Sequence, residues 1–244
     1  FEHPNIRSAS ACLMSSSFAV DLAHRHDARL HVLHLTTEIE MDLFSKADRG
    51  EKRITGEVCV HHLWFDESRY QDLGTRIKCN PAIKKATDRS ALIAALNEGR
   101  LDIIATDHAP HLIEDKKKSY FKVPAGMPLV QHALLTLFEL ARDGQISLEL
   151  LVDKTSHAVA DIYGVVDRGY IREGYFADLV LIDNKTPYTV NSSNLLYKCH
   201  WSPFEGETFS STIDTTIVNG HIIYQNGKLY GDIVGQRLQF KRGR

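Results

Sequence analysis

The sequence lacks the features that direct a protein to a membrane or to nucleic acid. It has no apolar run long enough to cross a bilayer. Its formal net charge is only −2, so it carries no excess of basic residues to attract phosphate backbones or anionic lipids. Its first residues, Phe1 to Pro4, do not form a basic region followed by an apolar one, as a secretion signal would. We therefore expect a cytoplasmic protein that binds neither nucleic acid nor membrane.

Paired cysteines are absent as well. Cys12, Cys59, Cys79 and Cys199 are far apart and form no Cys-x-x-Cys pair, which predicts reduced thiols rather than a disulfide framework. The chain does have 244 residues, 43% of them hydrophobic, which is enough for a core and for one or two domains. It also has 13 histidines, and several of them stand where strands are predicted to end.

The hydrophobic pattern predicts alternating strands and helices as far as Gly164. We expect strands at residues 29–35, 54–60 and 101–105, and helices at residues 8–26, 37–46, 87–96, 127–142 and 147–164. Such alternation is typical of βα units with a parallel sheet. Beyond Gly164, glycines separate short β-type runs, and Asn226-Gly227 is a strong hairpin signal. The sequence thus predicts an α/β domain over residues 1–164 and a small all-β domain over residues 165–244.

The third predicted strand leads into the most informative motif, Thr106-Asp107-His108-Ala109-Pro110-His111. In parallel α/β architectures, chemistry takes place at the carboxyl ends of strands. An aspartate there, with histidines one and four residues later, fits a metal or general-base site. A lone aspartate after a strand is also a common turn former, so Asp107 by itself leaves the structural interpretation open.

His34, near the end of the first predicted strand, is the second candidate. Side chains alternate along a strand, so His31 and His34 are expected to point to opposite sides. His34 lies nearer the carboxyl end and is the better site residue, whereas His31 is expected to face the surrounding helices as a structural residue. Imidazole and carboxylate together suit zinc and related divalent ions.

These motifs together resemble those of dihydroorotases, metal-dependent (β/α)8 barrels of the amidohydrolase superfamily. The Thr-Asp-His-Ala-Pro-His string is similar to the last metal-ligand motif of that family, and the strand with His34 is similar to one that supplies a metal-bound histidine. The spacing between the two candidates (107 − 34 = 73) also resembles that of bacterial members. The resemblance implies the C-terminal part of a metal-dependent (β/α)8 barrel over residues 1–164, followed by a small β-sandwich domain over residues 165–244.

The resemblance also implies roles for five residues. His34 and Asp107 match metal ligands, and Asp107 also matches the catalytic proton shuttle. Asn80 matches a residue that hydrogen-bonds the substrate ring, although Asn-Pro is also a common turn former. His111 matches a histidine that contacts the substrate carboxylate, and Gly126 a loop whose backbone touches substrate.

Two further segments have an expected structural role. The stretch from Gly56 to Leu63 resembles the family's Glu-Val-Thr-Pro-His-His-Leu, with Cys59-Val60 in place of Thr-Pro. The resemblance assigns no metal to His61 and His62, and adjacent strand residues point opposite ways, so we expect both to be structural. The charged residues 111–122 predict a solvated loop, with a mobile lid over the site as the alternative.

The activity implied by the resemblance is the reversible interconversion of (S)-dihydroorotate and N-carbamoyl-L-aspartate in de novo pyrimidine biosynthesis. The implied cofactor is Zn²⁺, binuclear in the complete enzyme, and the implied assembly is a homo-oligomer. Alternatives are an allantoinase, a hydantoinase or a non-catalytic homologue. Asn80 and the Ala109-Pro110-His111 ending favour dihydroorotase, and the presence of His34 and Asp107 favours an enzyme.

The resemblance leaves part of the metal site unaccounted for. The family takes further ligands from a His-x-His pair, a carboxylated lysine or aspartate, and another histidine, all expected before Arg29. His24-Arg25-His26 has the residue types of a His-x-His pair, but it lies at the end of a predicted helix, so we do not assign it as that ligand pair. We therefore expect a C-terminal portion of a longer dihydroorotase-like protein that lacks the N-terminal metal ligands and is inactive alone.

Overall fold

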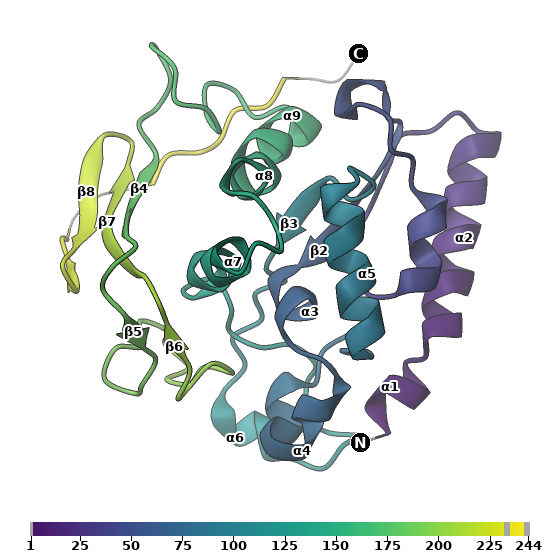
Figure 1. The fold of residues 1–244 in the computed structure, drawn as a ribbon, viewed down its shortest axis with the longest axis horizontal. Helices are drawn as coiled ribbons and strands as arrows, with labels where there is room; N and C mark the ends of the chain where they lie inside the picture. The colour runs from purple at the N-terminus through teal and green to yellow at the C-terminus, as the bar shows by residue number, and fades with distance from the viewer. Residues whose placement is uncertain (1, 232–234, 242–244) are drawn as a thin grey trace.

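The fold is built on three short parallel strands. The computed structural model describes residues 2–231 and 235–241 (Figure 1); residues 232–234 and 242–244 of the predicted small domain lie outside the described residues. The central sheet has the order β1-β2-β3, formed by β1 (Leu30–Val32), β2 (Ile54–Cys59) and β3 (Ile103–Ala105). Both neighbouring pairs are parallel, which confirms the predicted βα organisation. The carboxyl ends of all three strands consequently meet at one edge of the sheet.

Helices flank this sheet, with α2 and α5 on one side in Figure 1 and α7, α8 and α9 on the other. The α-helices are α1 (His3–Ile6), α2 (Ala9–Arg25), α3 (Val60–Trp64), α4 (Tyr70–Leu73), α5 (Ala86–Asn97), α6 (Ile113–Lys116), α7 (Ala133–Arg142), α8 (Leu148–Val152) and α9 (Ala158–Tyr163). The 3-10 helices are η1 (Glu38–Leu43), η2 (Arg49–Glu51), η3 (Glu67–Arg69) and η4 (Gly74–Ile77), and η5 (Asp153–His157) is π-helical. Among the described residues, no helix combines the length and apolar character needed to span a membrane.

Two predicted helices differ from the structure. The segment at residues 37–46 forms the 3-10 helix η1, and the Thr37 hydroxyl donates to the Glu40 carboxylate (2.6 Å) instead of capping a backbone amide. The helix predicted over residues 127–142 begins only at Ala133. Before that point the backbone amide of Leu129 donates to Nδ1 of His108 (3.0 Å). In a helix beginning at residue 127 this amide would lie in the first turn and have no partner within the helix, so the contact with His108 satisfies it instead.

Beyond Gly164 the chain forms antiparallel strands. One four-stranded sheet contains β4 (Leu179–Asp183), β7 (Thr212–Val218), β8 (His221–Gln225) and β9 (Lys228–Leu229), and a separate pair contains β5 (Tyr188–Thr189) and β6 (Thr208–Phe209). Asn226 and Gly227 join β8 to β9 with φ of 50° and 79°, as a tight hairpin turn requires. The described strands thus make one sheet and a two-stranded pair, and the expected sandwich stays a prediction.

The hydrophobic core extends across the predicted domain boundary. Trp201 and Phe204 are fully buried, and the Phe204 ring stacks on Phe65 with centroids 5.3 Å apart. Both aromatic residues therefore pack into the α/β body, although they lie beyond residue 165 in the sequence. In Figure 1 the sheet of β4, β7 and β8 forms a separate outer layer beyond α7. The domain boundary at residue 165 stays a prediction, because residues beyond it contribute both to the core of the α/β body and to the outer sheet.

A buried ion pair joins the segments that lead into β2 and β3. Lys52 Nζ lies 2.8 Å from Asp102 Oδ1, and the two side chains are only 1% and 2% exposed. The second carboxylate oxygen of Asp102 accepts from the backbone amide of Gly56 (3.0 Å). Lys52 also donates to the carbonyl oxygen of Gly99 (2.6 Å). The pair thus fixes β3 beside β2 and, through the sheet, the edge at which the candidate site lies.

Candidate metal and substrate site

His34 and Asp107 follow two strands of the central sheet at its carboxyl edge. Each lies two residues beyond its strand, since β1 ends at Val32 and β3 at Ala105. Because β1 and β3 flank β2, the two candidates stand after strands on either side of the same central strand. Both have left-handed backbones, with φ of 39° and 47°. Such conformations are uncommon outside glycine and cluster at functional sites.

Side-chain alternation does not relate His31 to His34, because β1 ends before His34. Within the strand, Nδ1 of His31 lies 2.8 Å from the Thr55 hydroxyl, and Nε2 lies 3.2 Å from a Glu57 carboxylate oxygen. The His31 ring also packs edge-on against Tyr163 of α9, with centroids 5.6 Å apart. These contacts agree with the predicted structural role of His31 and with its predicted contact with a helix.

The electrostatic surroundings of Asp107 link it to His34. Burial raises the pKa of Asp107, the charge of His34 lowers it, and the carboxylate of Glu57 raises it. By surface area Asp107 is exposed and His34 is partly buried, and the surrounding protein removes part of the water around the Asp107 carboxylate. A partly desolvated carboxylate with an imidazole in its electrostatic range can accept a proton or share a divalent cation with that imidazole.

The structure brings His111 and Gly126 together. Nε2 of His111 donates to the carbonyl oxygen of Ala125 (2.9 Å). Gly126 has φ of 118°, and a Cβ there would lie 2.4 Å from Cβ of Ala109 and 3.4 Å from Nε2 of His111, so the site requires glycine. The indole of Trp201 donates to the backbone oxygen of His111 (2.7 Å). The contacts of His111 with Ala125 and with Trp201 therefore hold the loop between His111 and Gly126 in place.

Lys116 ties this loop to the segment that carries Asn80. Its Nζ donates to the carbonyl oxygens of Lys78 (3.1 Å), Pro124 (3.0 Å) and Gly126 (2.8 Å). The Gly126 amide also donates to Lys78 (2.8 Å), two residues before the exposed Asn80. Burial lowers the pKa of Lys116 to about 8. The charged segment predicted as a solvated loop is therefore anchored at Lys116, and Asn80, His111 and Gly126 belong to connected segments.

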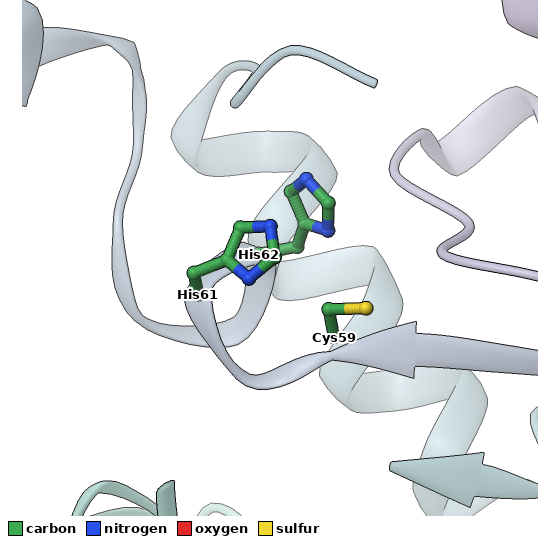
Figure 2. Close-up of side chains that lie close together, drawn as sticks. All are labelled: Cys59, His61 and His62. Atoms are coloured by element: carbon green, nitrogen blue, oxygen red, sulfur yellow. The ribbon is translucent and has the colours of Figure 1, made fainter. Parts of the chain in front are cut away.

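Sequence reasoning missed one compact group of metal-ligand side chains, Cys59, His61 and His62 (Figure 2). All three are buried, and one ligand atom from each lies within 4.8 Å of the others. The alternation argument is wrong for the two histidines, because β2 ends at Cys59 and α3 begins at Val60. Their rings lie side by side, with centroids 4.0 Å apart. The Cys-x-His-His spacing was the available signal, and the longer strand assumed for this segment concealed it.

Comparison with curated proteins gives relatives named dihydroorotase. The dihydroorotase of Methanosphaera stadtmanae is 33% identical over 224 residues, which cover 92% of this chain and 51% of that protein. The dihydroorotase of Halobacterium salinarum is 36% identical over 188 residues, covering 77% of this chain and 43% of that protein. The chain thus spans about half the length of the curated relatives that it matches.

Comparison with solved structures identifies chains that share the fold described above. A D-hydantoinase from Bacillus sp. AR9 superposes with a TM-score of 0.88 at 24% identity, covering 99% of this chain and 55% of that one. A dihydropyrimidinase from Brevibacillus agri NCHU1002 superposes with a TM-score of 0.80 at 25% identity, covering 88% and 48%. These likenesses confirm an α/β fold of the amidohydrolase barrel type. The profile of the amidohydrolase family matches residues 17–223. With the parallel βα units and the two strand-end candidates, this match shows that the chain belongs to the amidohydrolase family.

Proposed function

We propose that this chain functions in a dihydroorotase that interconverts (S)-dihydroorotate and N-carbamoyl-L-aspartate in pyrimidine biosynthesis. The observation that carries the proposal is the position of His34 and Asp107 after the flanking strands of a parallel sheet. Relatives named dihydroorotase at 33% and 36% identity support the same activity. The likeness to the Bacillus D-hydantoinase, at 24% identity, is evidence for the fold alone.

The donor set fits a divalent cation of the zinc class. His34 offers an imidazole nitrogen and Asp107 a carboxylate oxygen, both of which zinc accepts. When bound, such metal ions lower the pKa of water and polarise the carbonyl group under attack. Catalytic zinc sites use about three protein ligands for each metal, so a binuclear centre requires donors beyond these two.

Asp107 is the residue that we assign to proton transfer. Hydrolysis of the ring amide forms a bond from water oxygen to the amide carbon and breaks the carbon–nitrogen bond. The departing nitrogen must gain a proton while the attacking water loses one. The Asp107 carboxylate accepts the proton from water and returns it to the nitrogen, as a general base and then a general acid. In the reverse direction the same carboxylate moves a proton the other way as the ring closes.

The remaining predicted residues would orient the substrate. An asparagine amide such as that of Asn80 offers two donors and an acceptor, which suits a ring with both N–H and C=O groups. His111 already donates through Nε2 to Ala125, so its Nδ1 is the nitrogen available to a substrate carboxylate; the protonated imidazole donates from both nitrogens. Gly126 allows close approach of the backbone, since it carries no side chain.

The same proposal includes a cytoplasmic location and self-association. Met14, Phe18 and Leu22 recur at four-residue intervals on α2, and all three are exposed. Apolar side chains aligned along a helix form a surface that favours association with another protein surface. A second copy of the chain would be the partner in the homo-oligomer that we expect.

Substrate preference tests the proposed activity. We would join residues 1–244 to the part of the Methanosphaera stadtmanae dihydroorotase that the chain does not match, load the chimera with zinc, and compare dihydroorotate, hydantoin and allantoin as substrates. We expect dihydroorotate to be hydrolysed with the highest kcat/KM. A preference for hydantoin or allantoin would instead support one of the rival cyclic amidohydrolases. A folded, metal-loaded chimera without turnover would support the non-catalytic homologue.

Replacing His111 with alanine in this chimera is expected to raise KM for dihydroorotate roughly ten- to a hundredfold. The reason is the loss of a hydrogen bond to a charged carboxylate, which contributes about 1.5–3 kcal/mol. Metal content, measured by atomic emission, should stay unchanged. His221→Ala, at the exposed start of strand β8, is the matched control and should leave KM unaltered. Loss of metal in His111→Ala would mean that His111 is a metal ligand.

A further inference from the structure

Cys59, His61 and His62 have no part in the proposed reaction, yet they lie together where β2 passes into α3 (Figure 2). These residues are 0%, 1% and 3% exposed, and one ligand atom from each lies within 4.8 Å of the other two. We infer that these three residues form a buried binding site for a thiophilic divalent cation such as Zn²⁺. This inference goes beyond the proposed function and does not depend on it.

Unpaired nitrogen atoms support a ligand at this position. Within the described part of the chain, both ring nitrogens of His61 and Nδ1 of His62 are buried without a hydrogen-bond partner. A buried polar atom without a partner loses its hydration with nothing in return, so buried polar groups are nearly always paired. A cation would satisfy one nitrogen of each ring.

The hydrogen bond of His62 selects the nitrogen that would bind. Nε2 of His62 lies 3.2 Å from the carbonyl oxygen of Pro81, so Nε2–H is the donor and Nδ1 carries the free lone pair. A histidine ligand whose second nitrogen donates to a backbone carbonyl is the usual arrangement at metal sites, because that bond fixes the tautomer and the orientation of the ring.

The donor atoms select the class of cation. One sulfur and two imidazole nitrogens suit zinc and cobalt, whereas magnesium and calcium prefer oxygen ligands. Zinc bonds of about 2.3 Å to sulfur and about 2.0–2.1 Å to nitrogen place tetrahedral ligand atoms about 3.3–3.7 Å apart. Small side-chain rotations would bring the cluster to that spacing. Water would supply the fourth ligand.

Charge around Cys59 also favours a cation. Burial raises the pKa of the Cys59 thiol well above its usual range, and the carboxylates of Glu57 and Asp107 raise it further. Without a metal the thiol is therefore protonated. Binding breaks the S–H bond, forms a metal–sulfur bond and releases one proton to solvent. The resulting net charge of +1 on metal and thiolate lies within the electrostatic range of the two carboxylates.

Cobalt absorption tests this site directly. The full 244-residue chain would be stripped with a chelator, checked for folding by circular dichroism and titrated with Co²⁺. We expect an intense near-ultraviolet band from thiolate-to-cobalt charge transfer, which added Zn²⁺ removes. Cys59→Ser should abolish this band. Cys199→Ser, which alters another buried thiol outside the cluster, should retain it. His34 and Asp107 contribute no sulfur, so the band reports on this site whatever the outcome for the proposed function.

Ligand variants complete the test. His61→Gln and His62→Gln should each weaken Co²⁺ binding by roughly tenfold or more. If Cys59→Ser does not fold, these two variants test whether the cluster binds the metal. No thiolate band in the folded wild-type chain would overturn the inference. So would a band that survives in folded Cys59→Ser, one that Cys199→Ser abolishes, or one whose affinity neither histidine variant alters.

Discussion

Replacing Asp107 with asparagine is expected to lower kcat for dihydroorotate by about 10²–10⁴-fold in the zinc-loaded chimera, the range typical of general acid–base catalysis. The amide of asparagine cannot accept the proton from water or return it to the departing nitrogen. Asparagine has nearly the shape of aspartate and, like it, tolerates the left-handed backbone at this position (φ 47°). The fold should therefore persist, and circular dichroism would verify that it does.

Asp115→Asn is the matched control for this variant. Asp115 lies eight residues downstream (115 − 107 = 8), with a partly exposed carboxylate paired with Lys118. The same chemical change there should leave kcat within about twofold, because exposed ion pairs contribute little. If Asp107→Asn retained more than about a tenth of the wild-type kcat, Asp107 would not be the proton shuttle.

Replacing Asp102 with alanine is expected to destabilise the chain by about 3–5 kcal/mol. The substitution leaves the Lys52 ammonium buried without its partner carboxylate, since that side chain is only 1% exposed. It also removes the acceptor for the Gly56 amide. Urea unfolding of the two proteins, followed by circular dichroism, would measure the difference in the free energy of unfolding.

Two controls separate the buried charge from the loss of side-chain volume. The double variant Lys52→Met/Asp102→Leu removes both charges and keeps apolar volume, so it should cost clearly less than Asp102→Ala alone. Asp115→Ala breaks an exposed pair and should cost less than about 1 kcal/mol. A cost for Asp102→Ala as small as that of Asp115→Ala would show that the buried pair does not hold β3 beside β2.

The alternation of strands and helices was predictable because it depends on local signals. Short apolar runs separated by helical patterns predicted the parallel sheet, and Asn226-Gly227 predicted the hairpin between β8 and β9. The failures have tertiary causes. The amide of Leu129 bonds to His108, 21 residues away in sequence (129 − 108 = 21), and nothing local to residues 127–132 indicates that partner. Such contacts override helix propensity.

The candidate site was predictable only where strand ends define it. His34 and Asp107 follow strands that the sequence locates, whereas the exact end of β2 decides the geometry of Cys59, His61 and His62. An error of a few residues at a strand boundary changes which side chains can meet. The contact of Gly126 with Ala109 could not be predicted either, because it arises from the folded loop.

The most direct test of the central claim, that His34 and Asp107 hold metal at the carboxyl edge of the sheet, is a crystal structure of the zinc-loaded chimera with anomalous data at the zinc edge. We expect zinc within about 2.0–2.2 Å of an imidazole nitrogen of His34 and of a carboxylate oxygen of Asp107, with the two metals about 3.5–4 Å apart. Zinc bound elsewhere, with side-chain atoms of His34 and Asp107 more than roughly 8 Å apart, would contradict it, because ligands of one binuclear centre must cluster.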